Sequence, residues 1–173
     1  YKSKRTKNEM MRDMVKHAAY NMSFKYVLAD SWFSSAENMS CITEDCNSDF
    51  IMAIKSNRVV ALSKEDKEKG IYHSIESLEL GGRTMSVYLK QYSKPVQIAK
   101  QVFKNGDGST GRLYLATSDL NLDYSSLTTI YKKRWKVEEF FRSIKNNAAF
   151  AKAPTKTIKT QQAHFLSLIH ISE

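Results

Sequence analysis

The spacing of apolar side chains changes along the chain, and each spacing predicts a type of element. Near the start the spacing is helical, and the predicted helix ends near Asn21, with Thr6 or Asn8 as its N-cap. The apolar positions of this helix are Met10, Met14, Val15 and Ala18. The short apolar run 24–29 then predicts a buried strand. The chain is therefore expected to open with a helix followed by a strand.

The middle of the chain is predicted to consist mainly of strands. A helix around 36–44 precedes them, and the polar stretch 63–80, broken at Gly70, is expected to form one or two helices. Strands are predicted at 49–55, 85–89, 96–103 and 112–116, and in the second of these apolar and polar residues alternate. The last two can pair as a hairpin across a loop rich in Gly and Asn. The fold class that follows is mixed α/β.

The stretch 131–145 predicts an amphipathic helix that runs from about Leu127 to Asn146. At about 100° per residue, four polar side chains fall within an arc of roughly 60°, namely Tyr131, Arg134, Glu138 and Lys145. An apolar face suited to a core lies beside them and contains Ile130, Val137, Phe140, Phe141 and Ile144. A carboxylate held beside cations at the edge of a buried face suits a metal ion and a phosphate. The alternative is an ordinary i, i+4 ion pair between Arg134 and Glu138 on a helix surface.

A second candidate carboxylate, Asp30, directly follows the predicted strand 24–29 and begins the sequence Asp-Ser-Trp-Phe-Ser-Ser. A carboxylate at the end of a buried strand is well placed to project into a crevice. The alternative is that Asp30 caps a following helix, which could begin between Ser34 and Glu37.

Composition suggests a class of binding partner and leaves the predicted fold class unchanged. The chain has 173 residues, of which 42% are hydrophobic, enough for one globular domain. Its 27 basic and 18 acidic residues give a net charge of +9. The segment 131–159 carries nine Lys or Arg residues against two Glu, a local charge of +7. Such a basic segment suggests a polyanion, most simply nucleic acid, although a merely basic protein is the alternative.

The sequence gives little support for a zinc site, a membrane span or a signal peptide. Cys41 and Cys46 are the only cysteines, and no His lies near them at zinc-ligand spacing. No apolar run approaches the roughly 18 residues of a membrane span, and the basic start is not followed by the apolar segment of a signal peptide. We therefore expect a cytoplasmic protein with no membrane partner.

The gaps Tyr-x2-Arg-x3-Glu-x6-Lys, formed by Tyr131, Arg134, Glu138 and Lys145, resemble the signature of DDE transposases of bacterial insertion sequences, in the family named after insertion sequence four. The sequence that begins at Asp30 resembles the second-aspartate motif of the same family. This resemblance covers roughly residues 7–167 and implies a ribonuclease-H-like catalytic core with a β-rich insertion at about 56–120. Residues 1–167 would then form a partial catalytic domain. The end, 168–173, resembles a translated sequencing adapter and is interpreted as a non-native tail.

The resemblance also implies roles for particular residues. Asp30 and Glu138 would be two of three catalytic, metal-binding carboxylates, with Mg²⁺ as the cofactor and Mn²⁺ as a substitute. The DNA-binding residues would be Tyr131, Arg134, Lys145 and Trp135, the cations on phosphates and the aromatic rings on phosphate or displaced bases. The implied activity is metal-dependent DNA cleavage and strand transfer in cut-and-paste transposition. Its partners would be transposon ends and target DNA, with a dimer in the synaptic complex of a bacterial or archaeal, nucleoid-associated protein.

One departure from the family pattern concerns the first aspartate, which the family places on the first strand of the fold. Glu9 and Asp13 are the only acidic residues before Asp30, and both fall in the predicted helix. The first aspartate is therefore expected upstream of residue 1, and this fragment alone is expected to be inactive. Two alternatives stay open: a non-catalytic DNA-binding remnant of a transposase, and a nuclease or resolvase on the same fold.

Overall fold

The computed structural model describes residues 5–104, 106–147, 157 and 159. The chain divides into two units, residues 1–131 and 132–173, and each unit is described by itself. The expected loop 148–159 falls largely outside the described residues, and the predicted tail 168–173 does so entirely.

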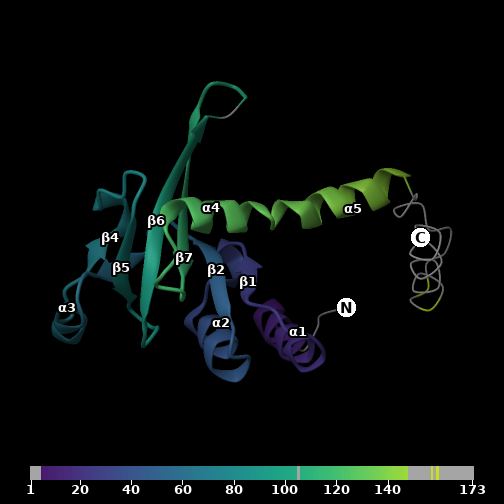
Figure 1. The fold of residues 1–173 in the computed structure, drawn as a ribbon, viewed down its shortest axis with the longest axis horizontal. Coiled ribbons are helices and arrows are strands. Elements are labelled where there is room, and N and C mark those ends of the chain that lie inside the picture. Colours follow the sequence, from purple (N-terminus) through teal and green to yellow (C-terminus); the bar gives the residue numbers. More distant parts are fainter. Residues whose placement is uncertain (1–4, 105, 148–156, 158, 160–173) are drawn as a thin grey trace. The chain divides into compact units, whose positions relative to one another are not determined.

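The first unit is organised around a seven-stranded mixed sheet with the strand order β1-β2-β7-β6-β5-β3-β4 (Figure 1). The strands are β1 Tyr26–Ala29, β2 Asp49–Ile54, β3 Val59–Ala61, β4 His73–Ser74, β5 Thr84–Leu89, β6 Pro95–Lys104 and β7 Thr110–Thr117. Among these named strands, β1 and β2 pair in parallel and the other pairs are antiparallel. The expected mixed α/β class and the expected hairpin of β6 and β7 are both confirmed. The short strands β3 and β4 were not predicted.

Helices and single turns connect these strands. The α-helices are α1 Lys7–Asn21, α2 Ala36–Ser40, α3 Lys64–Lys69, α4 Tyr124–Lys132 and α5 Trp135–Asn147. The turns are the 3₁₀ segments η1 Ser31–Phe33 and η3 Ile75–Ser77 and the π-helical segment η2 Cys41–Asp45. Gly70 ends α3 in the left-handed conformation, with φ of 74°, which explains the predicted break there. No helix in the described ranges is long and apolar enough to cross a membrane.

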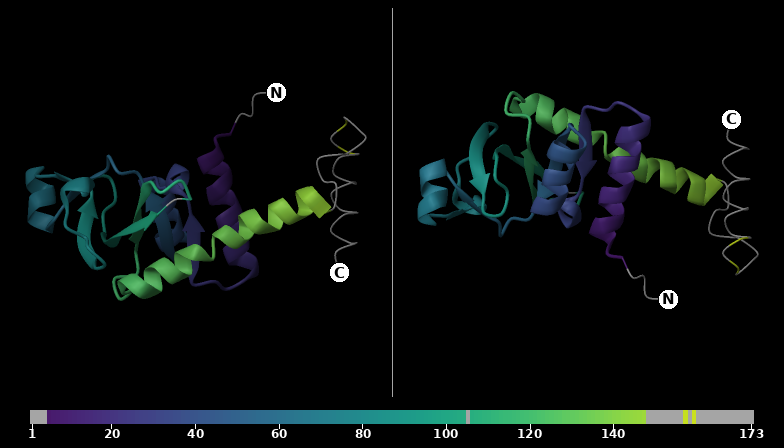
Figure 2. Two further views of the ribbon diagram at one scale, coloured as in Figure 1. Left: turned by 90° about the horizontal axis from the view of Figure 1, so that it is seen from above. Right: turned by 90° about the horizontal axis from the view of Figure 1, so that it is seen from below.

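Both faces of the sheet are covered by helices. Alternate residues of a strand point to opposite sides of the sheet, so one strand can contribute to two cores. Phe50 and Met52 of β2 belong to a core shared with α1 and α2. Ile51, between them in sequence, belongs to a second core with Leu127 and Tyr131 of α4. The views along the sheet in Figure 2 show α1 and α2 on one side and α4 on the other. Burial on both faces explains why β2 reads as a continuous apolar run.

The predicted cap and boundaries of the first helix are confirmed, but its predicted apolar face is only partly right. Thr6 forms a capping box with Glu9. Met11 and Val15 pack against the core, whereas Met14 is 72% exposed. Apolar residues occur on more than one side of α1, so periodicity alone did not identify the packed face.

The single helix expected from about Leu127 to Asn146 is also wrong, because α4 ends at Lys132 and α5 begins at Trp135. Two backbone bonds between residues three apart close the turn, from Lys136 N to Lys133 O and from Val137 N to Arg134 O, at 3.1 and 3.2 Å. Lys132 and Lys136 are like charges four positions apart, which disfavours a continuous helix here. Angles computed on one helical wheel therefore do not hold across residues 133–134.

The second unit contains α5, whose predicted core face is exposed in the structure. Val137, Phe140 and Phe141 are 55%, 59% and 57% exposed. The rings of Phe140 and Phe141 contact each other edge to face, with centroids 5.7 Å apart. Packing of this helix against the strand that ends at Ala29 stays a prediction.

The β-rich section predicted as an insertion, about 56–120, contains β3 to β7. These strands do not form a separate sheet, since β7 pairs with β2 from Ile51↔Thr117 to Ile54↔Tyr114. The sheet is thus continuous from the parallel pair into the β-rich section, and the bounds of the insertion stay an interpretation.

Candidate active site at the end of strand β1

Asp30 lies directly after β1, and its carboxylate organises the turn that follows. Its Oδ1 accepts a hydrogen bond from the backbone N–H of Trp32 at 2.9 Å. Its carbonyl accepts a second bond from Phe33 N at 3.2 Å. Asp30 is exposed to solvent. The carboxylate thus has a fixed orientation while it stays accessible.

Both sequence interpretations of Asp30 are partly right. It follows a strand, and it also caps a helical turn, but that turn is η1 and not the longer helix that follows. The longer helix α2 has its own N-cap, because Ser35 Oγ accepts a bond from Asn38 N at 3.2 Å. Capping of α2 therefore does not explain the position of Asp30.

A buried asparagine in α2 fixes the turn that follows Asp30 through side-chain hydrogen bonds. Asn38 is fully buried, and its Nδ2 donates to Phe33 O at 2.9 Å and to Asn8 Oδ1 at 2.7 Å. Its Oδ1 accepts from an Arg12 N–H at 2.8 Å. One side chain thus connects α1, α2 and the turn after Asp30. Because the Asn38 side chain is fully buried and each of its polar atoms is bonded, the turn is held in one conformation.

A second clamp comes from the loop after β2. The Arg58 guanidinium donates to Ser34 O, and Ser34 Oγ donates to Ser31 O at 2.9 Å. Sequence reasoning missed both Asn38 and Arg58. The only local signal was the Ser-Ser-Ala-Glu stretch that starts α2, and it does not identify their partners. Lys55, the residue directly after β2, lies at the same end of the parallel pair as Asp30.

Tyr131, the first residue of the four-residue signature, contacts the residue before Asp30. Tyr131 is 7% exposed, and its hydroxyl donates to Ala29 O at 3.3 Å. The predicted contact of Tyr131 with DNA is not part of this arrangement, which instead ties α4 to the end of β1. The signature tyrosine therefore has a structural role in the described unit.

Removal of this hydroxyl gives a first test. Tyr131→Phe is expected to lower the free energy of unfolding by about 1 kcal/mol, the usual net value of one hydrogen bond, and the melting temperature by about 2–4 °C. DNA affinity should not change, because the hydroxyl faces protein backbone. Tyr124→Phe, the same change on the same helix, is the control. An equal melting temperature for wild type and Tyr131→Phe, together with weaker DNA binding, would contradict the structural role.

In the second unit, Arg134 and Glu138 form an ion pair with an N–O distance of 2.9 Å, and their side chains are 26% and 42% exposed. This geometry is that of the ordinary i, i+4 ion pair, the alternative interpretation of these two residues. Partly exposed i, i+4 pairs contribute about 0.3–0.5 kcal/mol to folding stability. The ion pair therefore adds little to the stability of the protein. Trp135 is 48% exposed. Lys145 lies in α5, and its side chain is outside the described part.

A divalent metal ion fits the chemistry of Asp30 but needs more ligands than this residue offers. Hard cations such as Mg²⁺ prefer carboxylate oxygens, and the Asp30 carboxylate is exposed and oriented. Among the described residues, no three His, Cys, Asp or Glu side chains are grouped so that they could hold a metal. Asp30 and Glu138 belong to the two separate units, so their proximity stays a prediction.

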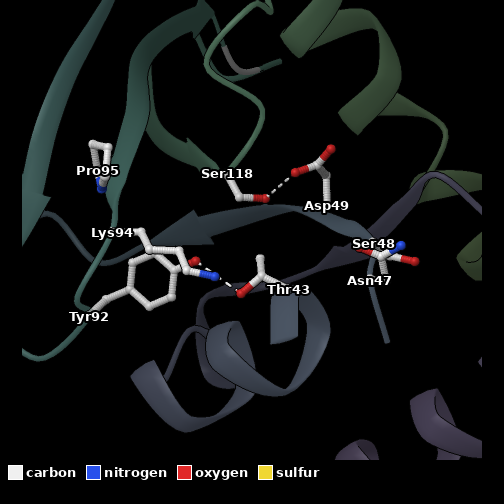
Figure 3. A pocket seen from close by; sticks show the side chains of 8 residues that line it. All are labelled: Thr43, Asn47, Ser48, Asp49, Tyr92, Lys94, Pro95 and Ser118. Carbon is white, nitrogen blue, oxygen red and sulfur yellow. Dashed lines mark hydrogen bonds between the residues drawn. The ribbon is translucent and has the colours of Figure 1, made fainter. Parts of the chain in front are cut away.

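The opposite end of the parallel pair contains a cavity of about 260 Å³, lined by Asp49, Ser118, Tyr92 and Thr43 among others (Figure 3). Asp49 pairs with the first residue of β1, so it lies at the other end of the strand from Asp30. Its Oδ1 accepts from Ser118 Oγ at 2.7 Å, and the Tyr92 and Thr43 hydroxyls lie 3.1 Å apart. These polar groups satisfy one another and join strand ends, so this carboxylate is structural.

Asp119, just past β7, is a further carboxylate at that end. It accepts a hydrogen bond from Tyr26 Oη at 2.7 Å and forms an ion pair with Lys25 Nζ at 3.2 Å. The bond from Tyr26 is the main reason that the pKa of the Asp119 carboxyl is lowered. Asp119 therefore fastens β1 to the end of β7. Of these three strand-end aspartates, Asp30 is the exposed one, and within the described residues its carboxylate receives a bond only from its own turn.

Comparison with protein families identifies the class of domain. A family model described as a transposase DDE domain matches residues 2–172. No curated protein matches the chain.

Proposed function

The chain belongs to the family of transposase DDE domains, and on this premise we propose that it supplies part of an active site that cuts DNA and joins it to a target. The mixed sheet with helices on both faces agrees with the ribonuclease-H-like fold expected for this family. The observation that carries the proposal is the position of Asp30, which is exposed and oriented on a clamped turn at the end of β1. The assignment to the family named after insertion sequence four rests on the four-residue signature.

A basic hairpin at the same end of the sheet supports DNA as the substrate. β7 pairs with β2 only as far as Tyr114, but β6 and β7 continue to pair out to Lys104↔Thr110 (Figure 1). This extension passes the end of β2 that lies beside Asp30. By the register of the pair, Lys100, Lys104 and Arg112 lie on one face of the ribbon. A two-stranded ribbon fits the major groove of DNA, and three cations on one face can contact phosphates.

The roles proposed for the signature residues follow the family. Asp30 and Glu138, together with the first aspartate of the family pattern, would hold Mg²⁺, with Mn²⁺ as a substitute. Two such ions, when bound, stabilise the attacking and leaving oxygens of an in-line displacement at phosphorus. Arg134 and Lys145 would hold phosphates near the scissile bond, with bidentate geometry available only to the arginine.

Arg134 and Glu138 would change partners when DNA binds. Without DNA they pair with each other, as the structure shows. With DNA bound, the guanidinium would turn to a phosphate and the carboxylate to the metal. Trp135, half exposed beside Arg134, would stack on a base near the cleavage point. A dimer would bring two such sites to the two ends of the element.

Binding to DNA is expected to weaken steeply with salt and to depend little on sequence. Cations supply the phosphate contacts, and each lost contact lowers the salt slope by about one unit. Lys104→Ala and Arg134→Ala should each show this reduction in fluorescence anisotropy titrations at several KCl concentrations. Lys69→Ala, which removes an exposed lysine of α3, is the matched control. An affinity that is equal at low and moderate salt would contradict the electrostatic basis of binding.

The alternative function is a DNA-binding remnant of a transposase without catalytic activity. The Arg134–Glu138 ion pair favours it, because a carboxylate already paired with a cation needs no metal. Both functions predict the same salt dependence, so binding alone does not separate them. Metal-dependent cleavage separates them, because only the catalytic function requires the two carboxylates.

A further inference from the structure

Trp32 exposes a large aromatic surface beside the candidate catalytic carboxylate. It lies in η1, two residues after Asp30, and it is 64% exposed. Its neighbour Phe33 packs against the core instead. Tryptophan side chains are highly buried on average, so an indole left in solvent at a candidate site needs an explanation.

The indole is exposed on a rigid turn and not on a loose loop. The backbone N–H of Trp32 is the group that holds Asp30 Oδ1, at 2.9 Å. The next carbonyl, Phe33 O, is held by the buried Asn38 at 2.9 Å. The position of the ring is therefore coupled to that of the carboxylate, and ordering it on a ligand costs little entropy.

A cation lies over the ring. Lys7 Nζ, from α1, is 5.9 Å from the centroid of the Trp32 ring. A cation over one face of an indole leaves the other face for a flat group. An aromatic platform beside a cation is the combination by which proteins bind single-stranded nucleic acid, the ring on a base and the cation on a phosphate.

We propose that Trp32 is a stacking site for an unpaired nucleobase of the DNA bound at Asp30, with Lys7 on an adjacent phosphate. This site rests on the proposed function, since it requires DNA at the end of β1. It differs from the positions that the four-residue signature assigns, because it belongs to the turn after the strand. A base held on this ring would fix the backbone of the DNA next to the Asp30 carboxylate.

Tryptophan fluorescence tests the stacking directly. The chain has two tryptophans, so Trp135→Phe leaves Trp32 as the reporter. A single-stranded thymidine oligomer should quench its emission, whereas an abasic oligomer with the same number of phosphates should not. In the otherwise unchanged chain, Trp32→Ala should weaken binding of the thymidine oligomer by about 5- to 150-fold. Trp32→Phe should keep most of the affinity, because a ring is still present.

The abasic oligomer separates base stacking from phosphate binding. Trp32→Ala should leave its affinity for this oligomer unchanged, whereas Lys7→Ala should weaken both oligomers equally. If Trp32→Ala weakens both oligomers alike, the ring is only a structural part of the turn and the stacking site is wrong. Bound DNA with unchanged Trp32 emission would overturn the stacking site alone. No binding of either oligomer would overturn both the stacking site and the proposed function.

Discussion

Asp30→Asn and Glu138→Gln should each abolish Mg²⁺-dependent nicking of DNA in a polypeptide that also contains the first aspartate, while both variants still bind DNA. An amide keeps the shape of the side chain but loses the charge that a divalent cation needs. Loss of the metal removes several kcal/mol of transition-state stabilisation, which corresponds to a rate decrease of about 10³-fold or more. Conversion of supercoiled plasmid to the open circle, with Mg²⁺ present, measures this rate.

Asp30→Asn removes the charge of the carboxylate without removing its hydrogen bond to the backbone. The asparagine Oδ1 can still accept the bond from Trp32 N, so the turn after β1 is retained. Asp49→Asn provides the matched control, since Asp49 lies at the opposite end of the parallel pair and bonds to Ser118. This control should nick at the wild-type rate. Cleavage near that rate in Glu138→Gln would show instead that Glu138 is only the ion-pair partner of Arg134.

Asn38→Leu should be strongly destabilising, although its side chain has no direct contact with the Asp30 carboxylate. The substitution removes the bonds to Phe33 O, Asn8 and Arg12 and leaves their polar groups unpaired. Unpaired buried groups cost about 1–3 kcal/mol each, and partial access to water for the two side chains reduces the total to about 2–4 kcal/mol. For a chain of this size the melting temperature should fall by about 5–12 °C, as followed by circular dichroism.

Asn8→Ala is the graded control for this network, because it removes only one of the bonds to Asn38. Its cost should be about 1 kcal/mol. The Asn38 variant should also nick DNA more slowly than the Asn8 variant at a temperature where both are folded, since the turn that carries Asp30 loses its support. Equal melting temperatures for the two variants would show that the buried asparagine does not hold the turn.

The sequence by itself determined the elements whose patterns are local. The run that became β2 is apolar because both of its faces are buried. Apolar and polar residues alternate in β5, and Gly and Asn mark the loop between β6 and β7. Thr6 and Glu9 specify the start of α1 through a capping box within four residues. The position of Asp30 at a strand end could also be predicted, because strand and aspartate are adjacent. The fixed gaps of the four-residue signature identified the family, but they did not determine that residues 133–134 interrupt the helix.

Only the tertiary structure decided which side chains hold Asp30 in place. Asn38 reaches Asn8 across 30 positions, and Tyr131 reaches Ala29 across 102. Such bonds depend on how elements pack together, and no local preference records them. The same holds for α1, where several faces carry apolar residues and packing selected Met11 and Val15 over Met14. Local residue preferences therefore set the elements and placed the carboxylate, whereas packing between distant elements fixed its orientation and left Trp32 exposed beside it.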